Sequence, residues 1–354
     1  MKCRIFCALL LSALVPRFGH SWDLRSIGID RYRVRHVSLY HSRAFLTLES
    51  SNGEWTLKAL CNQHALHNLL SPTPFVVTLV EATWPENTGN QWPRVLSDEW
   101  DERTCRGLRR VLGTDIDRLA RLWVLCGAEV RDELDCPPKL VIRSLISPGT
   151  GEIHHRFGRA DQQRLHAIVV DPVPASDGDT RAFITLVDQD HVLLYSLFKR
   201  TIGKLQFQKN DLTSLHPISL SEVTINNNRL YVADTVSDRL FALPVRNIRQ
   251  LAFPEDGVRK IIMKTNVTYL GRLLGRPCGL KLDFRDNLLY VLQRDGAIVK
   301  WTPGRSLKAE NHRVILQQGS NITQIILGVA GKAWAVSGEY ISPETHRHCM
   351  KIVV

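Results

Sequence analysis

The segment TRAFITLVDQDHVLLYS, residues 180–196, decides the fold class of this chain. It holds two runs rich in β-branched, aromatic and aliphatic residues, 181–186 and 192–196, on either side of the polar group Asp188-Gln189-Asp190. Two such runs around a short polar group are typical of antiparallel strands joined by a tight turn. The segment therefore predicts a β-hairpin.

The first strand of this hairpin recurs along the chain. Each copy begins with a small or polar residue, often Arg or Asn, and continues with an apolar residue, an aromatic residue and further apolar positions. The aromatic anchors lie 44 to 78 residues apart and are Phe45, Trp123, Phe183, Tyr231, Tyr290 and Trp334. Repeats of this length with several short strands each are typical of propeller blades. We therefore predict an all-β, six-bladed β-propeller that forms a single domain over residues 22–354; the alternative is another large all-β fold in which aromatic strands merely recur.

The N-terminal segment predicts a secretory signal peptide over residues 1–21. Lys2 and Arg4 precede an apolar run at residues 5–15, and Gly19-His20-Ser21 places small residues where a signal peptidase cuts, before Trp22. The apolar run is about half as long as the roughly twenty residues that a membrane span needs. We expect a secreted, extracellular protein without a membrane span.

The net charge of +11 is basic, and three of the basic residues fall in the predicted signal peptide, which leaves +8 on the mature chain. A secreted protein rarely meets nucleic acid, and these basic residues are not interleaved with stacking aromatic residues, so we expect no nucleic-acid partner. The charge indicates solubility and affinity for acidic matrix or membrane surfaces. Two sequons predict N-glycans at Asn266 and Asn321.

Six cysteines follow the predicted signal peptide: Cys61, Cys105, Cys126, Cys136, Cys278 and Cys349. An even number in an oxidising compartment favours disulfides. The cysteines form no paired CxxC arrangement of the kind that binds zinc. His346 and His348 lie close to Cys349, but the sequence assigns no carboxylate partner to them. We therefore expect no metal site and no cofactor.

Two motifs in the middle of the chain carry a family resemblance. RLWVLC at residues 121–126, followed by CPPKL at 136–140, resembles the Yellow / major royal jelly protein family, and the segments at 218–221 and 228–231 extend the similarity. The resemblance covers most of the mature chain in order. It implies a six-bladed propeller, in agreement with the repeats.

The chain also departs from the family pattern. Cys126 stands where the family has an aspartate after RLWVL, and no PRW motif follows the strand that ends at Leu48. The chain also lacks a cysteine just before RLW, where it has Leu119 or Ala120, and near residues 174–179, where many members have one, so the ordinary disulfides of the family cannot all form. We hypothesise that Cys126 pairs with Cys136 across the short loop between them, with Cys105 as the rival partner.

The resemblance implies three functions. The first is a structural or matrix-associated role with cuticle, pigmentation or eggshell components as partners. The others are a dopachrome-converting enzyme of the melanin pathway and a protein that binds biogenic amines in the central channel, with small aromatic amines or catechol derivatives as ligands. The two departures argue against inherited chemistry, so the structural role without catalysis is favoured.

An amine ligand in the channel requires carboxylates and an aromatic wall. The residues near the ends of the repeat strands that supply these groups are Asp188, Asp234, Glu222, Asp283 and Tyr231. The alternative is that the acids cap hairpin turns and the tyrosine belongs to the core. The channel separates the functions: a polar channel with converging acids favours a ligand, and an apolar, filled one favours the structural role.

Overall fold

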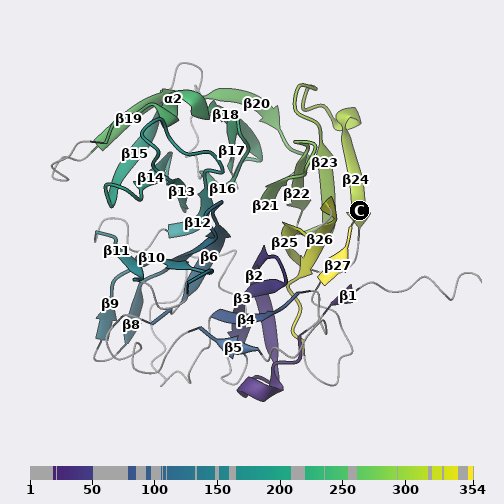
Figure 1. The fold of residues 1–354 in the computed structure, drawn as a ribbon. Helices are drawn as coiled ribbons and strands as arrows, with labels where there is room; N and C mark the ends of the chain where they lie inside the picture. Colours follow the sequence, from purple (N-terminus) through teal and green to yellow (C-terminus); the bar gives the residue numbers. More distant parts are fainter. Residues whose placement is uncertain are drawn as a thin grey trace, which may run out of the picture.

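The computed structural model describes residues 19–20, 22–50, 79–84, 93–96, 105, 107–108, 110–131, 134–147, 151–158, 165–208, 220–234, 236–253, 261–292, 294–317, 321–328, 331–341 and 350–353. The fold is an all-β propeller, in which antiparallel sheets stand around a common axis (Figure 1). The first strand of each sheet lies nearest the axis, and the chain then moves outward.

The first two sheets come from the N-terminal part of the chain. The first contains β2 (Tyr32–Tyr40), β3 (Arg43–Ser50), β4 (Leu79–Thr83) and β5 (Arg94–Val95). The second contains β6 (Val111–Ile116), β7 (Arg121–Cys126), β10 (Lys139–Ser144) and β11 (Ile153–Arg156). Between β7 and β10 the chain forms a separate hairpin of β8 (Glu129–Arg131) and β9 (Leu134–Cys136).

The next two sheets are linked by a crossover. The third contains β12 (Leu165–Val170), β13 (Arg181–Leu186), β14 (His191–Ser196), β15 (Thr201–Gln208) and β19 (Ile261–Asn266). The fourth contains β16 (Leu220–Ile225), β17 (Arg229–Asp234), β18 (Arg239–Pro244) and β20 (Thr268–Arg272). Helix α2 (Val245–Arg249) follows β18.

The last two sheets complete the ring. The fifth contains β21 (Pro277–Leu282), β22 (Leu288–Leu292), β23 (Ala297–Trp301) and β24 (His312–Gln317). The sixth contains β25 (Ile322–Leu327), β26 (Ala333–Ser337), β27 (Met350–Ile352) and the N-terminal β1 (Gly19–His20). Short 3-10 turns cover Arg25–Ile27 and Ala309–Asn311.

The predicted count of six blades is wrong. The structure has five regular, four-stranded blades, and the third sheet, with five strands, departs from the blade form. Its extra strand, β19, pairs in parallel with β15 and then leads into β20, the outer strand of the fourth sheet. The chain therefore crosses from one sheet to the next at their outer edges, so that the third sheet departs from the blade pattern.

The predicted repeat strand occupies the same place in every sheet. The aromatic anchors lie on the second strand counted from the axis, in β3, β7, β13, β17, β22 and β26, and all six are buried. The hairpin predicted from residues 180–196 is confirmed as β13 and β14, with Phe183 opposite Leu194. The aromatic anchor is conserved among the repeats of this chain because its side chain fills the space between two sheets.

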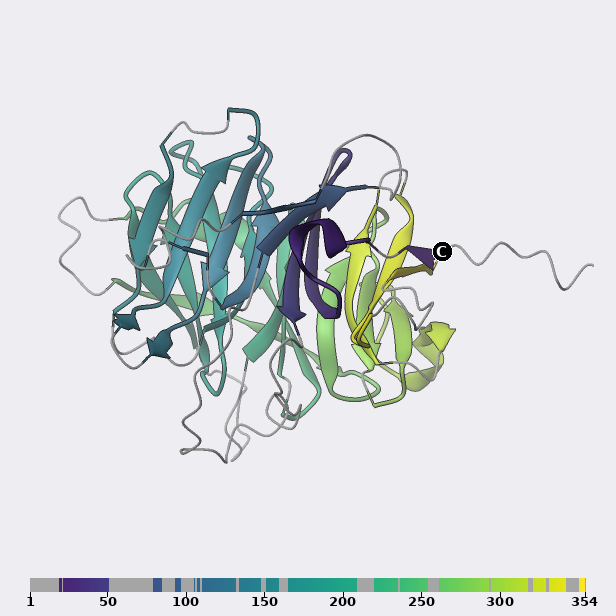
Figure 2. The same cartoon turned by 90° about the horizontal axis from the view of Figure 1, so that it is seen from below.

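The core consists of six apolar clusters, and each cluster joins two neighbouring sheets. Trp84 of the first sheet and Trp334 of the sixth meet edge to face, with ring centroids 5.1 Å apart, where the two ends of the ring come together. Figure 2 shows the first sheet between the second and the sixth, with β1 beside β27. The ring is thus closed by apolar packing as well as by strand pairing.

The predicted disulfide between Cys126 and Cys136 is wrong. Cys136 pairs with Cys105, and the Cα atoms of the two residues are 5.4 Å apart. The side chain of Cys126 is buried with Val124 in the cluster between the first and second sheets, whereas Cys136 lies at the end of the β8–β9 hairpin. Burial raises the pKa of the Cys126 thiol to about 12, so it stays protonated.

Three further expectations meet the structure only in part. Most of the predicted signal peptide lies outside the described residues, and Gly19–His20 form β1. The sequon residues Asn266 and Asn321 are both exposed. No helix among the described residues is long and apolar enough to cross a membrane.

Candidate functional site

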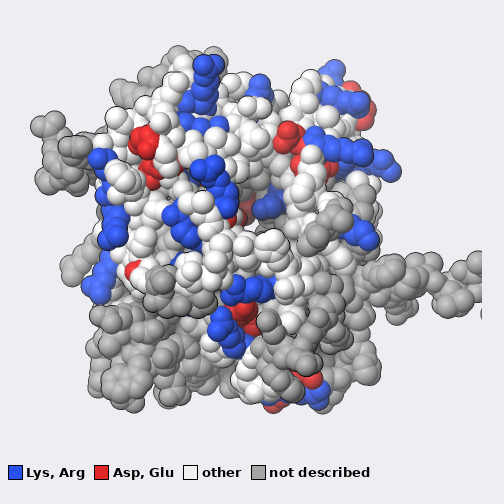
Figure 3. Space-filling model, viewed as in Figure 1, with Lys and Arg blue, Asp and Glu red and all other residues white. Residues whose placement is uncertain are grey.

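Polar side chains lie on the strands nearest the axis. These inner strands are β2, β6, β12, β16, β21 and β25, and each contacts the next around the ring. We name as the axial site five of their partly exposed or paired polar residues: His36, Asp115, His166, Glu222 and Lys281. Figure 3 shows acidic and basic side chains together near the middle of the ring.

The inner strands share a local irregularity that brings these side chains to the axis. Every inner strand shows a register shift against its second strand, for example between Val34 and His36 in β2 and between Leu220 and Glu222 in β16. A β-bulge leaves one residue without a partner in the ladder and turns the neighbouring side chains away from the regular alternation. The polar residues therefore stand near the axis while the apolar ones pack between the sheets.

Lys281 on β21 interacts with residues on the far side of the ring. Its positive charge acts on His36 of β2 and Asp115 of β6, although β21 is adjacent to neither strand. It adds to burial in lowering the pKa of His36, and it opposes the larger effect of burial, which raises the pKa of Asp115. Among the residues that the structure describes, Lys281 forms no ion pair. A cation without a paired anion in such a place is suited to an anionic group of a ligand.

Burial is the main cause of the pKa shifts of His36 and Asp115, the two groups on which the Lys281 charge acts. For His36, burial and the Lys281 charge lower the pKa to about 3, so its imidazole is neutral, and Nδ1 lies 3.1 Å from Thr114 Oγ1. For Asp115, burial raises the pKa, although its carboxylate accepts hydrogen bonds from the backbone N–H groups of Val170 and Ile116. Burial thus favours the protonated form of the Asp115 carboxyl relative to an exposed aspartate.

His166 and Glu222 form the second polar pair of the axial site. His166 Nε2 lies 3.2 Å from Glu222 Oε1, and the two residues come from the adjacent inner strands β12 and β16. The Glu222 side chain is 14% exposed, and that of His166 is 39% exposed, so a ligand on the axis has access to the histidine. A histidine and a carboxylate at this distance can pass a proton between them.

Other polar groups of the inner strands hold the ring together. Gln324 Oε1 accepts a hydrogen bond from the backbone N–H of Val37 at 2.7 Å, and its Nε2 donates to Val37 O at 3.2 Å. Ser38 Oγ lies 2.8 Å from Thr114 Oγ1. These contacts join β25 to β2 and β2 to β6, so we assign Gln324 and Ser38 to ring closure and leave them out of the axial site.

Of the five residues predicted to bind a ligand, only Glu222 lies in the axial site. Asp188 is exposed in the β13–β14 turn, and Tyr231 is buried in the cluster between the fourth and fifth sheets. Asp283 accepts hydrogen bonds from the backbone N–H groups of Arg285 and Asn287, which closes the β21–β22 turn.

Asp234 is fully buried and pairs with the guanidinium of Arg239, with Nη2 2.8 Å from Oδ2. It also accepts a hydrogen bond from the Val236 N–H. Asp234 and Asp283 therefore organise turns, which is the alternative that the sequence left open.

Four members of the axial site were not predicted from the sequence: His36, Asp115, His166 and Lys281. The predicted residues were chosen near the ends of the repeat strands, whereas the polar residues of the axial site lie on the strand that precedes each repeat strand. The available signal was an ionisable residue inside a β-rich run shortly before an aromatic anchor, such as Asp115 eight residues before Trp123. Among the described residues, no group of three or more His, Cys, Asp or Glu could hold a metal ion, and His346 and His348 lie outside them.

Solved structures with the same architecture are distant in sequence. A streptogramin B lyase structure aligns with a TM-score of 0.52 and 10% identity over 92% of this chain and 84% of the lyase chain. An auxiliary nutrient binding protein from Bacteroides thetaiotaomicron aligns with a TM-score of 0.52 and 8% identity over 91% of this chain and 72% of that protein. At such identities the likeness shows the fold alone.

One family model matches part of the chain. No curated protein matches the chain. The family model described as "Major royal jelly protein" matches residues 197–341, from the end of β14 to the bridge after β26. This match agrees with the motif resemblance at residues 121–140 and with the propeller fold. The match covers less than half of the chain and is consistent with a divergent member of the Yellow / major royal jelly protein family.

Proposed function

We propose that this protein is a secreted, Yellow-type propeller that binds a small polar molecule in the axial site. The observation that carries the proposal is the placement of His36, Asp115, His166, Glu222 and Lys281 on the inner strands, where the charge of Lys281 acts on His36 and Asp115 and Lys281 has no ion pair among the described residues. A channel that served only to close the ring would be filled by apolar or mutually paired side chains. A polar channel with converging ionisable groups was expected for a ligand-binding protein, and an apolar, filled one for a structural protein. The axial site therefore favours a ligand over a purely structural role.

The axial site supports a ligand with two kinds of polar group. Lys281 provides a cation for a carboxylate or a deprotonated hydroxyl, and Glu222 with His166 provides an acceptor for an ammonium or a phenolic O–H. Small aromatic amines and catechol derivatives, the ligands implied by the family resemblance, carry such groups. Secretion is supported by the Cys105–Cys136 disulfide, which is typical of proteins from oxidising compartments.

Conversion of dopachrome is the second candidate, and two observations favour it. Tautomerisation needs one group that removes a proton and another that returns it. Burial raises the pKa of Asp115, and His166 lies 3.2 Å from Glu222, so the axial site contains groups for both steps. A structural role in cuticle, pigmentation or eggshell remains the alternative if the axial site binds nothing.

Calorimetric titration with a biogenic amine and with a catechol carboxylate, run beside a dopachrome decay assay, tests these functions. We expect saturable heat for wild type, and for Lys281→Gln or Glu222→Gln an affinity at least about tenfold weaker, because each removes a charge-assisted hydrogen bond. Asp188→Asn is the matched control, because Asp188 is an acid in an exposed turn away from the axis.

Each outcome assigns one function. Heat without turnover that is lost in the axial variants supports a binding protein. Dopachrome decay faster than the spontaneous rate, and slowed in Asp115→Asn, makes the protein an enzyme. The absence of heat and of turnover, or equal loss in Asp188→Asn, contradicts the axial site and leaves the structural role.

A further inference from the structure

One end of the ring carries the turns that join each inner strand to its second strand. We name it the turn face; it contains the β2–β3, β6–β7, β12–β13, β16–β17, β21–β22 and β25–β26 turns. Hydrogen bonds between turns of neighbouring sheets place them at the same end. Arg121 Nη2 donates to Thr180 Oγ1 at 2.8 Å, and Asn226 Nδ2 donates to Asp286 Oδ1 at 3.1 Å. Because successive strands are antiparallel, the β10–β11 and β14–β15 turns lie there too.

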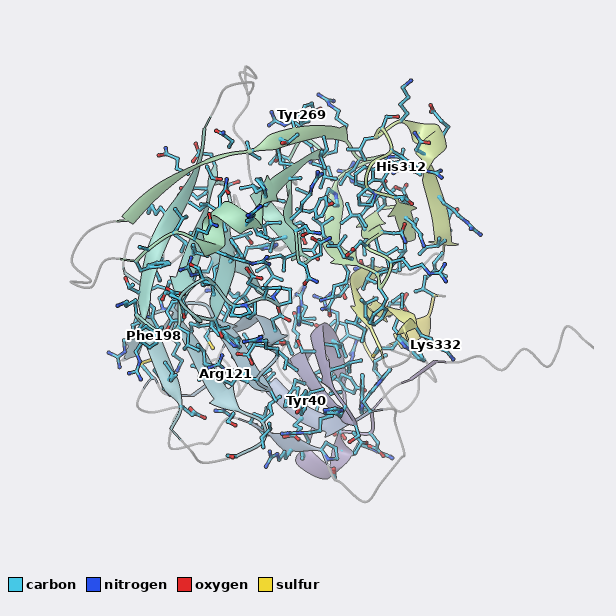
Figure 4. All side chains as sticks on the ribbon, turned by 45° about the horizontal axis from the view of Figure 1, so that its top comes forward. Tyr40, Arg121, Phe198, Tyr269, His312 and Lys332 are labelled. Carbon is cyan, nitrogen blue, oxygen red and sulfur yellow. A yellow bond between two sulfur atoms is a disulfide. The ribbon has the colours of Figure 1, made fainter. Side chains whose placement is uncertain are left out.

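Large apolar side chains are exposed at the tips of four of these turns. Leu119 is 54% exposed in the β6–β7 turn and Ile146 is 69% exposed in the β10–β11 turn. Phe198 is 75% exposed in the β14–β15 turn, and Phe284 is 66% exposed in the β21–β22 turn. They come from three sheets around the ring, and Figure 4 shows Phe198 at the margin of the molecule, on the opposite side from Lys332. Polar residues are the usual ones at turn tips.

Basic side chains accompany three of the four tips. Arg118 precedes Leu119, Lys199 and Arg200 follow Phe198, and Arg285 follows Phe284. Lys199 Nζ lies 5.4 Å from the centroid of the Phe198 ring, so the ammonium and the ring stand together. Further exposed basic residues on the same face are Arg229, Arg246, Arg305, Lys308 and Lys332.

Acidic residues cancel only part of this charge, because the exposed acids of these turns, Glu152, Asp177, Asp286 and Glu310, are fewer than the exposed basic residues. Asp117 and Asp171 of the turn face are buried, and each is already paired with an arginine, Arg121 and Arg249 respectively. The turn face therefore presents a surplus of positive charge with apolar groups projecting from it.

We propose that the turn face docks on an anionic lipid bilayer. Basic side chains near the surface of such a bilayer are attracted by its negative potential, and apolar tips gain by entering the boundary between headgroups and acyl chains. A sulfated polysaccharide would attract the same charges, but it offers no apolar phase to the four tips, so the lipid surface fits both features. Docking in this way leaves the axial site accessible from the other end of the ring.

Sedimentation with vesicles tests the proposal on the full-length protein. We expect wild type to bind phosphatidylcholine vesicles that contain about 30 mol% phosphatidylserine and not vesicles of phosphatidylcholine alone. The paired variant Arg118→Glu with Arg285→Glu should weaken the partition onto anionic vesicles at least about tenfold. Phe198→Ser with Phe284→Ser should weaken it at least about fivefold, because the apolar contribution is lost.

Matched controls come from the opposite end of the ring. Arg294→Glu changes the charge of an exposed arginine in the β22–β23 turn, and Val236→Ser replaces a side chain that is 44% exposed in the β17–β18 turn. Both should bind anionic vesicles as wild type does. A fluorophore attached to Phe198→Cys gives an independent reading that needs no loss of function: its emission should shift to the blue on anionic vesicles only.

The following outcomes overturn the proposal. The first is wild type that does not bind anionic vesicles. The second is binding that falls as much in Arg294→Glu and Val236→Ser as in the turn-face variants. The third is binding to heparin that depends on Arg118 and Arg285 but not on the phenylalanines, together with indifference to vesicles, which would assign the face to a sulfated polysaccharide.

Discussion

At the scale of single residues, buried aspartates at strand ends hold the turns of this propeller. Asp117 is the most connected example. Its Oδ2 accepts hydrogen bonds from Arg121 Nε at 2.6 Å and from Trp123 Nε1 at 2.8 Å, and its Oδ1 accepts from the Leu119 N–H at 2.9 Å. One carboxylate thus fixes the β6–β7 turn and the orientation of an anchor tryptophan.

Replacement of Asp117 by Ala should therefore destabilise the protein. We expect the free energy of unfolding to fall by about 3 kcal/mol, because Trp123 would keep a buried donor without an acceptor and Arg121 would lose its ion pair. Urea unfolding followed by fluorescence measures the change. Asp177→Ala is the control: its side chain is 43% exposed, and its ion pair with Arg181 should contribute less than about 1 kcal/mol. Equal losses in the two variants would contradict the role of Asp117.

At the scale of elements, the β8–β9 hairpin is tied to the segment before β6. The Cys105–Cys136 disulfide closes a loop with a sequence separation of 31 residues around β6 and β7. Cys126, which the sequence suggested as the partner of Cys136, lies on β7. This residue is paired with Lys139 of β10, and its side chain is buried in the core without a bond to Cys136. The register of two strands, not the spacing of the cysteines, selects the disulfide.

A peptide map of the non-reduced protein tests this pairing. We expect one peptide pair that links Cys105 to Cys136, and a Cys126 that reacts with a thiol reagent only after denaturation, because burial keeps it protonated. Cys105→Ser with Cys136→Ser should lower the free energy of unfolding by about 3 to 4 kcal/mol. A peptide pair that links Cys126 to Cys136 would restore the sequence-based hypothesis and reject the observed connection.

At the scale of the whole molecule, the ring encloses ionisable groups that titrate differently in the folded and unfolded chain. His36 is the clearest case, because burial and the Lys281 charge lower its pKa from 6.5 to about 3 in the folded protein. Between these two pH values the unfolded chain binds a proton that the folded chain does not. The contribution of neutral His36 to the free energy of unfolding is therefore fully present above the unfolded pKa of 6.5. It is lost as the pH falls toward the folded pKa of about 3.

Acidification should accordingly weaken the ring in a way that depends on His36. We expect His36 to contribute a loss of up to about 1.4 kcal/mol per pH unit below pH 6.5. The raised pKa of Asp115 has the opposite sign above its unfolded pKa and offsets part of the loss. Chemical unfolding of wild type, His36→Gln and the control His154→Gln between pH 7 and pH 4 measures the difference. A pH dependence that His36→Gln leaves unchanged would show that other groups cause it.

The sequence alone determined the all-β propeller fold class, and it predicts secretion. Local patterns encode both: strand runs with polar turns, the recurring aromatic anchor, and the basic and apolar N-terminal segment. It also contained the RLWVLC and CPPKL motifs, and the family match at residues 197–341 agrees with the resemblance that they carry. Such features are read along the chain, within a few residues of each other, and need no knowledge of long-range contacts.

Only the tertiary structure decided what depends on residues far apart in sequence. The strand β19 joins the edge of the third sheet, Cys136 meets Cys105 rather than Cys126, and the charge of Lys281 acts on His36 and Asp115. The strand pairing, the disulfide and the electrostatic effect of Lys281 on His36 and Asp115 all depend on how strands pair and how sheets pack around the ring. A pairing shifted by one residue would turn these side chains to the other face of the strand, so their positions follow from packing and not from local sequence.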